Sequence, residues 1–140
     1  DMVDRAKKAF VPPFANHIFA DPAGSFTTGA AMVAEVSRAL KAKFGTDLKG
    51  KRIVIFGGAG VVAYVAAVIG ALEGAKTVLV GHDGEERVSK IAFTMKWRFG
   101  IEVGAVDGTT PDARRAATTY ADVILSAGPA CVSLLTAEDL

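Results

Sequence analysis

The stretch from Ile53 to Leu72 limits the possible folds of this chain more than any other part of the sequence. It opens with Ile53 to Phe56, a run rich in β-branched residues that has the length of a buried parallel strand. A glycine turn, Gly57 to Gly60, follows directly and leads into small apolar residues that favour a helix. Because Thr77 to Val80 then has the pattern of a second strand, the sequence predicts a βαβ unit here.

The glycine turn fits the pattern G-x-G-x-x-G/A over Gly58 to Ala63, which is the fingerprint of dinucleotide-binding turns. We expect Gly58 to turn the chain sharply out of the strand with a positive φ, and Gly60 to let a pyrophosphate approach the backbone. Unpaired amides at the start of the next helix then favour the negative charge of the phosphates. The cofactor-binding residues predicted from this turn are Gly57, Gly58, Ala59, Gly60, Val61 and Val62.

Two other interpretations of the same stretch are open. Its run of about twenty uncharged residues is as long as a membrane-spanning helix, although the glycines at mid-span would weaken such a helix. The turn can also belong to an α/β protein that binds no nucleotide, because this fold needs tight turns whatever it binds.

Composition narrows the choice of partners. The chain has 140 residues, 51% of them hydrophobic, and a chain of this size buries one ordinary core. Its 16 basic and 15 acidic residues are interspersed, which argues against nucleic acid or an anionic membrane as a partner and favours small molecules or copies of the same chain. The single cysteine, Cys131, cannot form an internal disulfide, and no signal-peptide pattern opens the chain, so we expect a reducing cytoplasm.

Helical and strand patterns alternate along the rest of the chain. The sequence predicts helices over 2–10, from Thr27 or Thr28 to Gly45, over 84–99 and over 111–120, and strands over 16–20, 101–106 and 122–127. This order predicts an α/β fold with a Rossmann-type doubly wound parallel sheet. We expect residues 1–45 to form the end of an N-terminal substrate domain with its crossover helix, and residues 46–140 a truncated nucleotide-binding domain. Thr136 is expected to cap a further helix, and the chain to be part of a longer protein.

The residues that follow the second and fourth strands are the next candidates, because ligands bind at the carboxyl ends of parallel strands. After the second strand, Asp83 is placed to accept a hydrogen bond from a ribose 2′-hydroxyl, whereas His82 leaves room for a 2′-phosphate, so NAD and NADP are both open. After the fourth strand, Ser126, Ala127 and Gly128 form a small surface that suits a nicotinamide. Plain solvated turns are the alternative at both places.

Four stretches of the chain together resemble the NAD(P)-dependent methylene-tetrahydromethanopterin dehydrogenases of one-carbon metabolism. The resemblance extends over nearly the whole chain, and the first of these stretches, which contains Asp-Pro-Ala-Gly-Ser-Phe-Thr-Thr, makes it specific. Ala63 and Cys131 depart from it, because glycine is usual at both positions in the family. The four stretches are Phe19 to Thr28, Gly57 to Val62, Glu73 to Gly84 and Ala121 to Gly128.

The resemblance implies an enzyme that transfers a hydride from the methylene carbon of a pterin substrate to NAD(P)+, and a homo-oligomer in the full-length form. No proton leaves such a substrate, so no general base is needed, and we assign no catalytic residue and no metal ligand. The loop that is expected to face the pterin contains Asp21, Ser25, Thr27 and Thr28, and a helix-capping turn is its alternative.

Two other functional classes are open. One is a different NAD(P)-dependent dehydrogenase, such as one that acts on methylene-tetrahydrofolate, and the other is a nucleotide-sensing module without catalysis. In either case His17 is expected to be packed or exposed and not catalytic. We expect the 140-residue chain by itself to bind cofactor poorly or not at all and to be inactive, because a complete dinucleotide-binding fold uses further strands.

Overall fold

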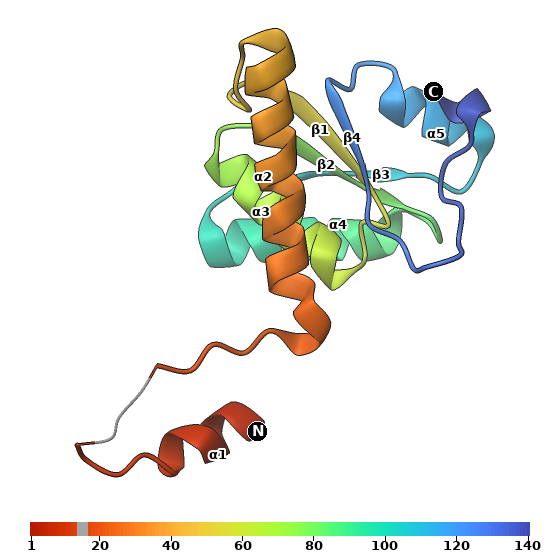
Figure 1. The fold of residues 1–140 in the computed structure, drawn as a ribbon. Coiled ribbons are helices and arrows are strands. Elements are labelled where there is room, and N and C mark those ends of the chain that lie inside the picture. Colours follow the sequence, from red (N-terminus) through yellow and green to blue (C-terminus); the bar gives the residue numbers. More distant parts are fainter. Residues whose placement is uncertain (14–16) are drawn as a thin grey trace.

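The core of the fold is a parallel sheet whose strands alternate with helices along the chain (Figure 1). The computed structural model describes residues 1–13 and 17–140, and its two short 3₁₀ turns are Pro22–Gly24 and Ala137–Asp139. In chain order the other elements are α1 (Met2–Lys8), α2 (Ser25–Phe44), β1 (Arg52–Phe56), α3 (Val61–Leu72), β2 (Lys76–Gly81), α4 (Glu85–Phe99), β3 (Gly104–Asp107), α5 (Pro111–Thr118) and β4 (Val123–Ser126).

The four strands lie in the order β3-β2-β1-β4, and each neighbouring pair is parallel. In this register Ile53 of β1 lies beside Thr77 of β2 on one side and Val123 of β4 on the other. The predicted parallel sheet is therefore confirmed. The uncharged run 53–72 is divided into a strand, a turn and a helix, and no helix within residues 1–13 and 17–140 is long and apolar enough to cross a membrane.

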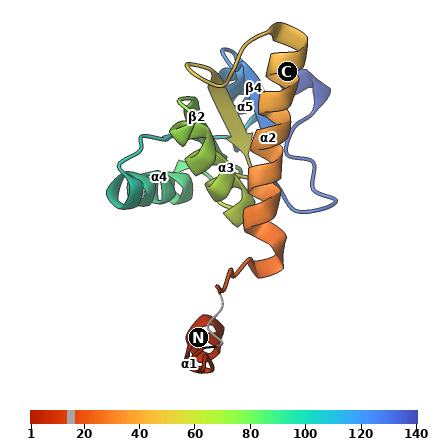
Figure 2. The same cartoon turned by 60° about the vertical axis from the view of Figure 1, so that its left-hand side comes forward.

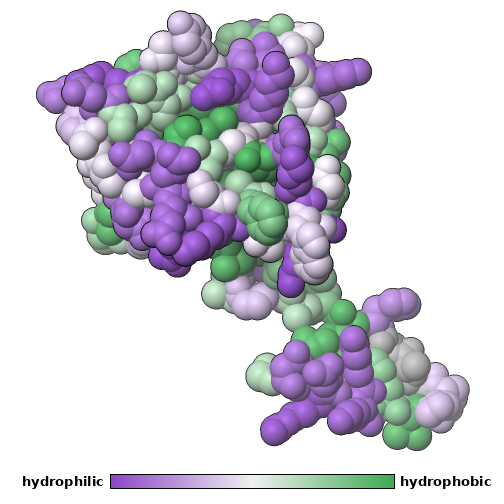
Figure 3. All heavy atoms as spheres, turned by 180° about the vertical axis from the view of Figure 1, so that it is seen from behind, coloured by the Kyte–Doolittle hydropathy of each residue, from purple (hydrophilic) through white to green (hydrophobic). Residues whose placement is uncertain are grey.

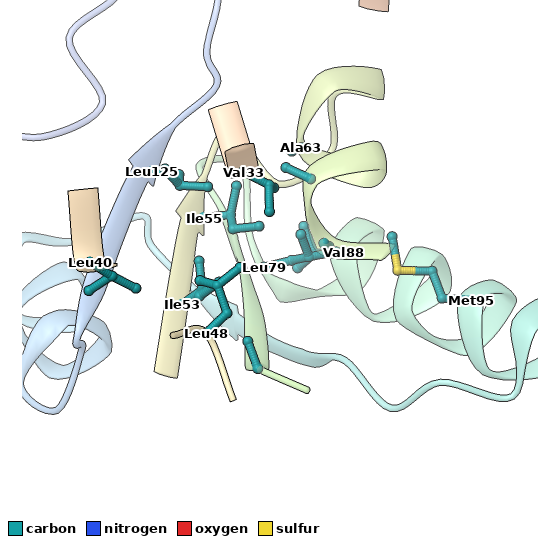
Figure 4. Packing of buried hydrophobic residues seen from close by; sticks show 13 residues of the cluster. Val33, Leu40, Leu48, Ile53, Ile55, Ala63, Leu79, Val88, Met95 and Leu125 are labelled. Carbon is teal, nitrogen blue, oxygen red and sulfur yellow. The ribbon is translucent and has the colours of Figure 1, made fainter. Parts of the chain in front are cut away.

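Alternate residues of the central strands pack against helices on the two faces of the sheet. On one face, Ile53 and Ile55 of β1 and Leu79 of β2 form a core with α2, α3 and α4, which Figure 4 shows from close by. On the other face, Val54, Phe56 and residues of β2 pack against Ala117 of α5 and against the segment that follows β4. Because both faces are covered, the strands are nearly continuous runs of hydrophobic residues.

Helix α2 is the long element that crosses in front of α3 in Figure 1 and lies beside it in Figure 2. It starts at Ser25 and not at Thr27 or Thr28, because the side chain of Asp21 accepts hydrogen bonds from backbone amides of its first turn. It ends as predicted at Gly45, which has a left-handed conformation with a φ of 62°. Since α2 shares the core of the sheet, the boundary between residues 1–45 and 46–140 stays a prediction.

Helix α1 is present as predicted, although it ends at Lys8, and none of its residues is buried. It lies apart from the α/β unit (Figures 1 and 2). The strand predicted over 16–20 is wrong for residues 17–20, which have no regular structure and pair with no strand of the sheet. Asn16 lies outside the described residues.

Two predicted boundaries and the type of one predicted element near the C-terminus need correction. The strand predicted over 101–106 begins only at Gly104, because its pairing with β2 starts where Gly104 meets Val78. Helix α5 ends at Thr118, two residues before the predicted end. Thr136 is an N-cap as predicted, but the element that it caps is a 3₁₀ turn.

Seen from behind, hydrophilic and hydrophobic side chains alternate over the surface in small areas (Figure 3).

Candidate functional site

A cleft of about 380 Å³ lies at the carboxyl ends of β1, β2 and β4. It brings together three parts of the chain that the sequence indicated separately, namely the glycine turn, the end of β2 and the end of β4. Two further residues, Ser25 from the start of α2 and Arg87 from α4, complete it. The lining residues are Ser25, Gly57, Ala59, Gly60, Val61, Val62, His82, Arg87, Ala127, Gly128 and Pro129.

Gly57 is the residue that turns the chain out of β1. Its φ is 74°, a conformation that residues with a side chain rarely adopt. A Cβ atom at this position would lie 2.8 Å from the carbonyl carbon of Ala127 and from the amide nitrogen of Gly128. The expectation that Gly58 has the positive φ is therefore wrong, because the turn occurs one residue earlier. Gly58 instead fits closely against β2, where an added Cβ would lie 2.9 Å from the Cβ of Leu79.

Gly60 forms the part of the cleft from which α3 begins. Its amide donates to the carbonyl oxygen of Gly57 at 2.9 Å, so it is already used within the turn. The amides of Val61 and Val62 belong to the first turn of α3, where helix geometry supplies no carbonyl acceptor, and both residues line the cleft. Ala63 is fully buried against the sheet and allows close packing of α3. The cleft therefore presents helix N-terminal amides that suit an anion.

The end of β2 carries three groups that can be charged. The carboxylate of Asp83 lies 4.0 Å from Nδ1 of His82 and 3.8 Å from Nη1 of Arg87. His82 and Arg87 line the cleft, whereas Asp83 is not among its lining residues. The sequence analysis did not select Arg87. Its position four residues after Asp83, at the start of a helix that follows a strand end, was a signal that could have indicated it.

The end of β4 forms the opposite side of the cleft. The amide of Ala127 donates to the carbonyl oxygen of Phe56 at 3.0 Å, which continues the pairing of β4 with β1 for one more residue. Ala127 and Gly128 line the cleft, but Ser126 is still in the strand and is not among the lining residues. A Cβ at Gly128 would overlap the side chain of Leu134, so this turn has to be small for a structural reason as well.

The segment that leads into α2 holds the start of that helix and also contributes one residue to the cleft. The carboxylate of Asp21 accepts hydrogen bonds of 2.6 Å from both the amide of Phe26 and Oγ1 of Thr27. These bonds, that from Thr27 first, hold the pKa of Asp21 below its usual value. Asp21 and Thr27 thus form the helix cap, which the sequence left as the alternative, while Thr28 is exposed and Ser25 lines the cleft. A role of the four residues in substrate binding stays a prediction.

A second hollow of about 380 Å³ lies between α2, α3 and the end of α4. Its lining includes two edge-to-face aromatic pairs, Phe19 with Phe26 and Tyr64 with Phe99. No lining residue of this hollow, within the described part of the chain, carries a charge that would bind a phosphate. His17 is exposed, and residues 1–13 and 17–140 contain no group of three or more metal-ligating side chains.

Known proteins resemble this chain in sequence and in fold. Over all 140 residues, the chain is 91% identical to the NAD(P)-dependent methylenetetrahydromethanopterin dehydrogenase of Methylorubrum extorquens. The resemblance seen in four sequence stretches is thereby confirmed as a similarity over the whole chain. The chain spans 47% of the length of that relative, and no protein-family model matches it.

The fold has a relative among solved structures. An L-alanine dehydrogenase matches with a TM-score of 0.61 and 22% sequence identity, over 82% of this chain and 34% of that one. At this identity the likeness concerns the fold alone. Together with the parallel sheet and its flanking helices, it confirms the Rossmann-type α/β class predicted from the sequence.

Proposed function

We propose that this chain is the nucleotide-binding part of an oxidoreductase that transfers a hydride from methylene-tetrahydromethanopterin to NAD or NADP. The observation that carries the proposal is the 91% identity to a dehydrogenase whose name states this substrate and cofactor dependence. The cleft supports it independently, because its glycine turn and its position at the strand ends are those of a dinucleotide site.

The residues of the cleft fit a dinucleotide. Gly57 and Gly60 line the cleft beside Val61 and Val62 and bring no side chain into it, which supports the approach of a pyrophosphate to the N-terminus of α3. On the other side, Ala127 and Gly128 leave a flat, small surface for a planar ring. We assign to this site the predicted residues that line the cleft, with Gly58, Asp83 and Ser126 beside it; the lining residues are Gly57, Ala59, Gly60, Val61, Val62, His82, Ala127 and Gly128.

The chemistry asks little of the protein beyond position. Bound NAD(P)+ supplies a nicotinamide ring that accepts a hydride. The methylene carbon of the pterin loses a hydride ion, which takes both electrons of the C–H bond, and the substrate becomes a methenyl cation whose charge is shared by two nitrogens. No side chain has to remove a proton, so this chain's residues bind, orient and exclude water.

Ser25 is the candidate for contact with the pterin. It lines the cleft at the first position of α2, whereas Asp21 and Thr27 hold that helix end in place through their own hydrogen bonds. The opposing wall of the pterin site would come from a substrate domain. We propose that residues 1–45 form the end of that domain. A cytoplasmic location and a homo-oligomer of the longer protein are part of the same proposal.

The test needs the protein in two forms, this 140-residue chain and the longer protein that carries it. We expect the longer protein to reduce NAD+ or NADP+ with methylene-tetrahydromethanopterin, followed by the absorbance of the reduced nicotinamide. In the isotopically labelled longer protein, the amide signals of residues 57–62 should shift when either nucleotide is added, and in the 140-residue chain these shifts should be weak or absent.

The outcomes separate the alternatives. Turnover with methylene-tetrahydrofolate but not with the methanopterin substrate would favour the folate-linked dehydrogenase. Nucleotide binding without turnover of either pterin would favour a sensing module. If neither form of the protein binds a nicotinamide nucleotide, the proposed function is wrong.

A further inference from the structure

The positive charge in the cleft is confined to one place. His82 follows β2 directly, and Arg87 is the third residue of α4. Among the lining residues that the structure describes, these are the two that carry or can acquire a positive charge, and none is a carboxylate. The side of the cleft next to β2 is therefore suited to a second anion, in addition to the pyrophosphate that we propose at the start of α3.

Asp83 lies between these two groups, outside the cleft lining. One of its carboxylate oxygens is 4.0 Å from His82 and the other is 3.8 Å from Arg87. The side chains of His82, Asp83 and Arg87 are 54%, 45% and 64% exposed, and ion pairs of this length at such exposure contribute little. Arg87 is thus restrained only weakly by Asp83 and can turn toward a more highly charged partner.

The place of this group in the fold gives the identity of that anion. In dinucleotide-binding folds the residues at the end of the second strand meet the adenosine ribose, about 20 residues after the glycine turn. Asp83 stands at that distance from Gly60. A phosphate on the 2′ oxygen offers three acceptor oxygens and nearly two negative charges, to which a guanidinium binds by paired hydrogen bonds.

We propose that Arg87, together with His82, forms a subsite for the 2′-phosphate of NADP, and that Asp83 competes with the phosphate for Arg87. With NAD bound, Asp83 accepts a hydrogen bond from the 2′-hydroxyl and keeps its contact with Arg87. With NADP bound, Arg87 leaves Asp83 and binds the phosphate. The three side chains thus set the ratio of the two affinities, and this inference rests on the proposed nucleotide site.

The test compares two probes that differ only in the 2′-phosphate, adenosine 2′,5′-bisphosphate and adenosine 5′-monophosphate. Their affinities are measured by calorimetry or by amide shifts in the longer protein, once unchanged and once each with R87Q, D83N and R98Q. Arg98 is a matched control, because it is an exposed arginine on the same helix that does not line the cleft. All three positions are exposed, so the variants should fold, which a far-UV spectrum checks.

We expect R87Q to weaken the bisphosphate on the order of tenfold and to leave the monophosphate unchanged, because one charged hydrogen-bonding group to phosphate is lost. D83N should strengthen the bisphosphate, and R98Q should change neither affinity. Equal effects of R87Q on both probes, or no effect on either, would overturn the assignment of Arg87 while the nucleotide site stands. Binding of neither probe to the unchanged protein would overturn the proposed site and this inference with it.

Discussion

Gly60 offers a substitution that should separate cofactor binding from folding. Its φ and ψ are −83° and 156°, an extended conformation that any residue adopts. A Cβ at this position would lie 3.3 Å from the carbonyl oxygen of Gly57 and 3.6 Å from that of Ala127, so a small local shift accommodates it. We expect Gly60→Val to cost about 1 kcal/mol or less in the free energy of unfolding.

The same side chain should be costly for the nucleotide. The valine methyl groups would project from the residue that borders the amides of Val61 and Val62, where the pyrophosphate is expected. A hydrogen bond to a charged group contributes about 1.5–3 kcal/mol, so the loss of one such bond weakens binding by roughly 10- to 100-fold. NAD and NADP should lose the same factor, because they share the pyrophosphate.

Calorimetric titration of both nucleotides measures the loss, and a far-UV spectrum with a thermal melt checks the fold. Ala130→Val is the matched control, since it adds bulk to an exposed loop residue beside the cleft that is not among its lining. Gly57→Val is the contrast. Its φ of 74° costs about 1–2 kcal/mol for a side chain, and the backbone 2.8 Å away must move, so this variant should be destabilised. A folded Gly60→Val protein with unchanged affinity would refute the pyrophosphate assignment.

Three further outcomes are expected. Asp83→Ala should lower the affinity for NAD relative to that for NADP in parallel titrations, because only NAD presents a 2′-hydroxyl; an unchanged ratio of the two affinities would show that Asp83 does not contact the ribose. Asp139 is buried and accepts a hydrogen bond from Nε of Arg114 at 2.9 Å, which is the main reason that its pKa is lowered. This stabilisation is present above the unfolded pKa of about 3.9 and is lost as the pH falls through the lower folded pKa. Asp139→Asn should therefore lower the melting midpoint at pH 7 and make the midpoint fall less below pH 4. A midpoint unchanged at pH 7 would contradict this. The 140-residue chain alone should show no increase in reduced nicotinamide with the methanopterin substrate, and robust turnover would place the whole pterin site within this chain.

The strand, turn and helix from Ile53 to Leu72 were predictable because each depends on residues close together in the sequence. A β-branched run, clustered glycines and small apolar residues specify the three elements locally, and the structure places their boundaries within one residue of the prediction. The residue with positive φ was assigned wrongly for a tertiary reason. The fingerprint is counted from Gly58, but the backbone of Ala127 and Gly128 approaches Gly57, and no local pattern contains that approach.

The errors elsewhere have the same origin. Residues 17–20 have the composition of a strand, yet they are not strand because they pair with none of the four strands, and pairing depends on where the rest of the chain places them. Ile101 is hydrophobic because it packs beside the core and not because it belongs to β3. Arg87 was missed because an exposed arginine in a helix usually has no special role. It lies in the cleft because α4 begins directly after the end of β2, so its first turn stays beside the strand end.

The close contact between α2 and α3 explains how Ser25 is held at the side of the cleft where we propose that the substrate binds. A Cβ at Gly29 would lie 2.8 Å from the Cβ of Val65 and 3.0 Å from the carbonyl oxygen of Val62, so α2 approaches α3 as closely as a glycine permits. Because Val62 also lines the cleft, the first turns of the two helices are held in a fixed relation to each other. Asp21 then fixes the start of α2, and Ser25 is placed at the cleft by backbone packing. The proposed hydride transfer requires the donor carbon and the acceptor ring to be held at contact distance, and in that proposal the packed start of α2 is the rigid support for one side of the contact.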